Sequence, residues 1–135
     1  MDSGTPPFGF YSVSWQTVSD SCQPRRPERT SEEVVGSTEK LVSVVLSTDH
    51  RHQDIQWNEP FFFTSSECGL SISLEVVSKS ATSFVVDSQI DWVGANRACE
   101  PWAFLGIPSG DCSVHQTVTY ELNRPCPSKN LGSCP

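Results

Sequence analysis

The stretch of residues 111–127, DCSVHQTVTYELNRPCP, alternates apolar and polar side chains between two cysteines. Its apolar residues on one parity are Val114, Val118, Tyr120 and Leu122. Its polar residues on the other parity are His115, Thr117, Thr119 and Glu121. Successive side chains of a β-strand point to opposite faces, so this alternation predicts a strand with one buried face and one wet face. Gln116 is the exception to the pattern.

Similar alternation recurs along the chain, and helical periodicity is scarce. The stretches that show it are 11–15, 41–46, 54–63, 70–76 and 84–92. Together with 112–122 they predict about six strands, and Pro60 interrupts the third as an edge, a bulge or a break. We therefore expect an all-β fold, a small antiparallel meander that is closed as a barrel or folded as a sandwich.

Two long connections separate these strands. Residues 23–40 are polar and contain prolines, and SEEVV at 31–35 is predicted to form a short helical turn. Residues 94–112 are rich in glycine and proline but carry large apolar side chains. A chain of 135 residues suits one domain. We expect a flexible leader at 1–8, a single β domain at 9–122 and an irregular, disulfide-tethered tail at 123–135.

Six cysteines in so short a chain predict disulfide bonds, because no C-x-x-C and no zinc-type spacing of cysteine and histidine accompanies them. Disulfides persist in oxidising compartments. We therefore expect an exported protein of the periplasm, the outer-membrane surface or the extracellular space. The cysteines are Cys22, Cys68, Cys99, Cys112, Cys126 and Cys134.

Strands that alternate in direction would bring four of these cysteines to one end of the domain: Cys22, Cys68, Cys99 and Cys112. Cys126 would then pair with Cys134. For the other four, the favoured pairing joins Cys99 to Cys112, which closes the apolar loop, and Cys22 to Cys68, which holds the polar connection. The alternative, Cys22 to Cys112 with Cys68 to Cys99, is nearly as well supported.

The formal net charge of -7 opposes binding to nucleic acid or to anionic lipid. No apolar run approaches the roughly 20 residues of a membrane-spanning helix, so we expect no transmembrane segment. The first residues lack the basic and apolar parts of a signal peptide. We expect that an export signal, and any lipid anchor, was lost with the natural N-terminus.

EPWAFLGIP, residues 100–108, is the most informative connection. Its large apolar residues either cover the end of the barrel as a plug or stand out as anchors for another protein; they are Trp102, Phe104, Leu105 and Ile107. Arg25 and Arg26 form a basic cluster that could border such an interface. FFF at 61–63 raises the same question, since at least one ring must look outward or meet a covering loop.

Signals for catalysis and for metals are weak. His50 and His52 in DHRHQD (49–54) could ligate zinc or copper, but a polar hairpin tip explains them better. His115 could act as a general base if a carboxylate stood on a neighbouring strand. Asp87 and Asp91 could imitate a glycosidase pair, but solvation of an outer face accounts for them. We therefore expect no metal, no cofactor and no enzymatic activity.

Three stretches carry a resemblance to a known kind of protein. SDSC at 19–22, CGLSISLEV at 68–76 and DCSVHQTVTYELNRPCP at 111–127 resemble the small disulfide-bonded β domains of exported bacterial lipoproteins of uncharacterised type. The likeness extends over most of the chain and concerns its general texture. It implies a barrel-like plan similar to that of lipocalins, although GFYSVSW at 9–15 departs from their early G-x-W motif.

The leading hypothesis is a non-catalytic domain of the cell envelope or extracellular space that binds another protein there or contributes to an assembly. One alternative is a carrier of a small hydrophobic ligand, whose cavity would be lined by Trp15, Trp57, Trp92, Phe84 and Tyr120. Bulky side chains inside so few strands favour a filled interior instead. Another alternative is a secreted inhibitor or effector.

Overall fold

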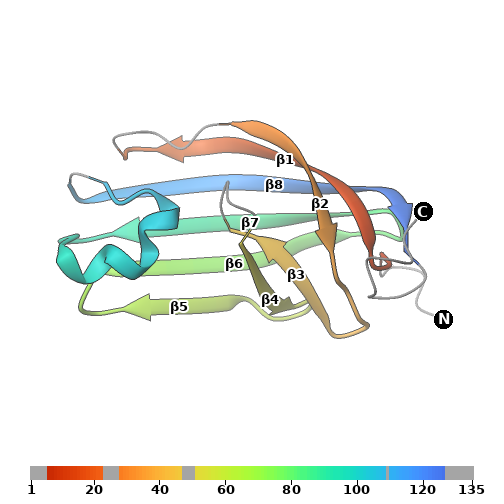
Figure 1. The fold of residues 1–135 in the computed structure, drawn as a ribbon, viewed down its shortest axis with the longest axis horizontal. Coiled ribbons are helices and arrows are strands. Elements are labelled where there is room, and N and C mark those ends of the chain that lie inside the picture. The colour runs from red at the N-terminus through yellow and green to blue at the C-terminus, as the bar shows by residue number, and fades with distance from the viewer. Residues whose placement is uncertain (1–5, 23–27, 47–50, 109, 127–135) are drawn as a thin grey trace.

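A computed structural model of this protein describes residues 6–22, 28–46, 51–108 and 110–126. It is an all-β, two-layer structure (Figure 1). The larger sheet is antiparallel and open, with strand order β2-β1-β8-β7-β6-β5. Its strands are β1 (Gly9–Asp20), β2 (Arg29–Val35), β5 (Phe61–Ser65), β6 (Leu70–Lys79), β7 (Ser83–Trp92) and β8 (Cys112–Pro125). The fold class is thus confirmed, and the sandwich is the form that the chain adopts.

A smaller sheet and a short helix cover one face of the large sheet. β3 (Leu41–Val45) pairs with β4 (His52–Gln56), and a 3-10 helix, η1, extends over Arg97–Leu105. Figure 1 shows β3 and η1 in front of the large sheet, with η1 at the end where β5 and β7 finish. The opposite face of the sheet has no covering element among the described residues.

The strict alternation of the sequence produces the core. The apolar parity of β8 is buried, and the apolar parities of β1, β6 and β7 line the same face. Phe84 lies at the centre, stacked on Tyr120 with ring centroids 4.3 Å apart and edge-on to Trp57 at 5.1 Å. Three of the five rings that a carrier would use to line a cavity, those of Trp57, Phe84 and Tyr120, therefore pack together.

The prediction of about six strands was too low, since the described residues form eight. β2 lies within the connection that was expected to be polar with a helical turn at 31–35. An edge strand needs few buried apolar side chains, and β2 buries only Glu33, Val35 and parts of their neighbours, so its pattern is faint. The expected strand at 54–63 is two strands, β4 and β5, which the turn before Pro60 separates.

The structured domain is also slightly longer than expected. Pro6 is buried, and its carbonyl accepts a hydrogen bond from Ser37 Oγ at 2.6 Å, so residues 6–8, predicted as part of a leader, belong to the folded domain. At the other end, β8 continues to Pro125 before the predicted tail begins.

The two disulfides that the structure describes join Cys22 to Cys112 and Cys68 to Cys99. The favoured pairing was therefore wrong and its alternative right. β1 and β8 are neighbours in the sheet, so Cys22, after β1, meets Cys112 at the start of β8. A simple meander does not predict this neighbourhood. Cys126 is buried, and its expected partner Cys134 lies outside the described residues.

Both tyrosines of the chain sit in the core and should titrate together with unfolding. The Tyr120 hydroxyl accepts a hydrogen bond from Val45 N at 2.8 Å, and Tyr11 donates one to the carbonyl of Pro7. Burial raises the pKa of each phenol well above its ordinary value of 10.0. The unfolded chain would thus lose these protons first, and the free energy of unfolding should fall as the pH rises above 10.

An alkaline titration tests this expectation. Phenolate absorbance should develop in one step that coincides with loss of the β signal in circular dichroism. A phenolate step near pH 10 with the β signal intact would show that at least one tyrosine is accessible.

Candidate functional site

The helix η1 is held firmly against the turn between β5 and β6. Asn96 caps its start, with Oδ1 accepting from Ala98 N at 2.8 Å and Nδ2 donating to the carbonyl of Glu67 at 3.0 Å. The disulfide from Cys99 to Cys68 adds a covalent link to the same turn. Gly106 ends the helix with a positive φ of 80°, a conformation that glycine adopts without strain. The side chains of η1 are therefore presented from a fixed platform.

The four apolar residues that were predicted as plug or anchor differ in how deeply they are buried. Leu105 is only 3% exposed and belongs to the core, so it is a plug residue and offers no contact surface. Trp102 and Phe104 are half-buried against the core, and Ile107 is 37% exposed. Arg25 and Arg26, predicted to border the interface, lie outside the described residues.

Trp102 and Phe104 form one wall of an apolar pocket of about 130 Å³. Its lining residues are Leu46, Gln53, Phe61, Phe63, Ile72, Trp102 and Phe104. The Trp102 and Phe63 rings are 5.7 Å apart, and the Arg51 guanidinium lies 4.5 Å from the centre of the Phe104 ring. A cavity of roughly 150 Å³ accommodates a benzene ring. The pocket is thus large enough for one apolar side chain of another molecule.

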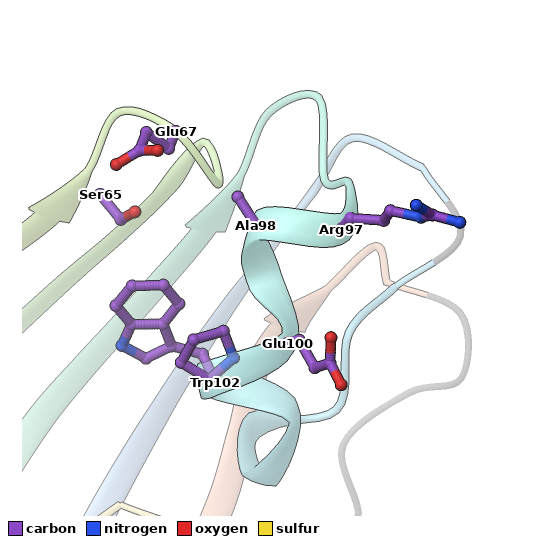
Figure 2. Close-up of a pocket in the computed structure, with 7 residues that line it drawn as sticks. Ser65, Glu67, Arg97, Ala98, Glu100 and Trp102 are labelled. Atoms are coloured by element: carbon purple, nitrogen blue, oxygen red, sulfur yellow. The ribbon is translucent and has the colours of Figure 1, made fainter.

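A second, wider hollow of about 570 Å³ continues from Trp102 to the end of β5. It is lined by Ser65, Glu67, Arg97, Ala98, Glu100, Pro101 and Trp102. Figure 2 shows the Trp102 ring on the side of η1 toward Ser65 and Glu67, whereas Arg97 extends away from them. The two hollows therefore meet at Trp102.

The strand beside both hollows, β5, is an edge of the large sheet and carries no charged residue. Phe61 and Phe63 face the pocket, and Phe62 points to the other side and is 70% exposed. An exposed, apolar edge strand is a template for pairing with another chain, and proteins usually protect such edges with charges. β2, at the opposite edge, carries such charges at Arg29, Glu32 and Glu33. β5 has no equivalent protection.

The FFF motif was the only signal in the sequence for this edge. Phe62 looks outward, whereas Phe61 and Phe63 line the pocket together with Trp102 and Phe104. The contributions of Leu46, Gln53 and Ile72 to the pocket were missed, because they come from three other strands or their ends and carry no motif of their own.

His115 has the neighbouring carboxylate that a general base would need. Its Nε2 lies 2.5 Å from Asp87 Oδ1 on the adjacent strand β7. The nearby hydroxyl of Ser113, however, donates to Asp91 Oδ1 at 2.6 Å, and Gln89 Nε2 donates to the same oxygen at 3.0 Å. The side chain that shares a hydrogen bond with the His115 ring is thus a carboxylate on the adjacent strand. Polar groups on the outer face are therefore paired with one another, as His115 is with Asp87 and Ser113 with Asp91.

Of the DHRHQD motif (49–54), Asp49 and His50 lie outside the described residues. His52 lies on β4 with Nε2 3.8 Å from Glu33 Oε1 on β2. In the described part of the chain, no group of three or more histidine, cysteine, aspartate or glutamate side chains is arranged to hold a metal ion.

The structure also bears on membrane insertion, since none of its described helices is long and apolar enough to cross a bilayer. Comparison of the chain with protein-family models, with curated proteins and with solved structures finds no match.

Proposed function

We propose that this protein is a non-catalytic, exported domain that binds another protein of the cell envelope or extracellular space. The contact would be made by Phe61, Phe62, Phe63, Trp102 and Phe104, which we call the docking surface. The observation that carries the proposal is the apolar pocket of about 130 Å³ between half-exposed aromatic rings on this surface. Aromatic residues dominate the binding energy of protein interfaces when they line pockets of this kind.

The rigidity of the frame supports binding as the role of this surface. Association loses affinity when flexible groups must be ordered. Here η1 is tied by its Asn96 cap and by the disulfide between Cys68 and Cys99, so the rings are ordered before the partner arrives. The same disulfides favour an oxidising compartment and hence an exported protein. The formal charge of -7 weighs against nucleic acid as the partner.

A double substitution, Trp102→Ala with Phe104→Ala, should weaken binding of the partner at least about tenfold, because each ring would count as a binding hot spot. The partner would first be isolated from envelope and extracellular fractions of the native host by cross-linking and then purified. Its dissociation constant for each variant would be measured by isothermal titration calorimetry.

Val77→Ala provides the matched control. Val77 is 56% exposed and lies on β6, near the end of the strand remote from η1, so its loss should leave the dissociation constant unchanged. Circular dichroism would check that each variant is folded. A purified partner that binds the double variant as tightly as the wild type would exclude the docking surface and, with it, the proposed function.

A further inference from the structure

We propose that the partner binds as an additional β-strand on the free edge of β5, through an extended segment that is apolar at its centre and basic at both ends. This inference rests on the proposed function and names the chemistry of the partner at the docking surface. Recognition of this kind uses backbone hydrogen bonds for affinity and side-chain pockets for specificity.

The backbone of β5 is available for such pairing. Residues 61–65 pair with residues 70–74 of β6, and β5 is the last strand of the sheet. In an antiparallel edge strand, alternate residues direct N–H and C=O groups away from the sheet. Figure 1 shows β5 at the margin of the large sheet, where it pairs with β6 on one side only.

The other three sheet edges are less open. β2 carries the charged residues Arg29, Glu32 and Glu33, and β4 carries His52 and Asp54. β3 has no charge, but its backbone is already occupied. Along β3, Ser43 N donates to the carbonyl of Gly36 at 2.9 Å, and Val45 N donates to the Tyr120 hydroxyl. Within the part of the chain that the structure describes, β5 is therefore the edge that offers both free backbone and apolar side chains.

The side chains around β5 define the centre of the partner segment. A strand added to β5 would place one parity of its side chains beside Phe61 and Phe63, at the mouth of the pocket. The other parity would lie beside the exposed ring of Phe62. Aromatic and β-branched side chains are favourable neighbours of aromatic rings across a strand pair. The segment should therefore carry apolar residues on both parities at its centre.

Carboxylates at both ends of β5 define the ends of the segment. Glu59 lies two residues before β5, Glu67 lies two residues after it, and both are exposed. Glu100 lines the same hollow as Glu67. The Arg97 side chain extends away from Glu67 (Figure 2). Arg51 is placed over the Phe104 ring. Complementary charge selects partners and speeds encounter, so lysine or arginine is expected at each end of the segment.

Synthetic peptides test the pairing without any change to the protein. The probe is a short peptide with valine and tyrosine at its centre and lysine at each end, and its matched control has glutamate at each end. The lysine peptide should bind at least about tenfold more tightly in calorimetry at low salt. N-methylation of its central amides, one at a time, should weaken binding strongly on one parity and little on the other, because only alternate amides pair with β5.

Charge reversal on the protein tests the ends. Glu59→Lys with Glu67→Lys should reverse the preference so that the glutamate peptide binds more tightly. Glu39→Lys, an exposed substitution in the turn between β2 and β3, is the matched control and should leave the preference unchanged.

The two proposals fail in different ways. Absence of peptide binding, equal losses for both parities of N-methylation, or an unaltered charge preference would each overturn strand addition on β5. If binding of the natural partner still required Trp102 and Phe104, the proposed function would hold even though strand addition on β5 had failed. If the natural partner did not depend on these rings, the proposed function itself would fail, whatever the peptides did.

Discussion

Replacing Phe84 by alanine should lower the free energy of unfolding by about 3–5 kcal/mol. Phe84 is almost fully buried in β7 and contacts three other rings, those of Tyr11, Trp57 and Tyr120. Tyr120 lies on β8, the strand next to β7, Tyr11 lies on β1 beyond β8, and Trp57 follows β4 of the small sheet. The ring therefore joins the two layers, and its loss leaves a cavity that the surrounding strands cannot readily fill.

Urea denaturation followed by circular dichroism would measure this loss. Val85→Ala is the matched control, since Val85 is the next residue on β7 and points to the uncovered face. Its cost should be well below that of Phe84→Ala. Phe84→Leu keeps most of the apolar volume and should be intermediate, which preserves the test if the alanine variant does not fold. Equal effects of Phe84→Ala and Val85→Ala would show that the rings do not form the shared core.

Replacing Cys22 and Cys112 together by serine should cost about 4–5 kcal/mol. This bridge closes a loop with a sequence separation of 90, and a cross-link of that length removes much of the entropy of the unfolded chain. The bridge from Cys68 to Cys99 spans a separation of only 31, so its removal should cost about 3–4 kcal/mol. The first value is a large share of the roughly 5–15 kcal/mol that stabilises most domains.

The two serine pairs should differ in binding as well as in stability. Loss of the bridge between Cys68 and Cys99 frees η1 from the turn after β5 and should weaken the partner complex. The bridge between Cys22 and Cys112 lies at the β1–β8 pair. Its loss should leave the affinity of the folded protein for the partner unchanged. Peptide mapping of the oxidised protein supplies the control. A peptide that links Cys99 to Cys112 would contradict both expectations.

Strands were predictable where one face is buried along their whole length. β8 and β6 have nearly unbroken alternation, and they were found close to their expected ends. β2 was missed because an edge strand can be polar on both faces without loss of stability. Its buried Glu33 accepts a hydrogen bond from Ser31 Oγ, a pairing that hydropathy alone does not reveal.

The candidate site was predictable only in part. The aromatic residues of 100–108 stood out because large apolar side chains in a polar, glycine-rich connection must be either covered or used. Sequence did not separate Leu105, which is covered, from Trp102 and Phe104, which are partly exposed. That distinction depends on how η1 turns over β5, and η1 is positioned by Asn96 and Cys99 through contacts with the turn around Glu67 and Cys68.

The sequence by itself determined the all-β class, the two-faced strands and the presence of disulfides, because side-chain period and cysteine count are local properties of the chain. Only the tertiary structure decided that β1 lies beside β8, that Cys22 therefore pairs with Cys112, and that β5 ends the sheet with its apolar side chains unprotected. Strand order is set by packing between segments far apart in the sequence. An edge exists only once every other strand has found its neighbours.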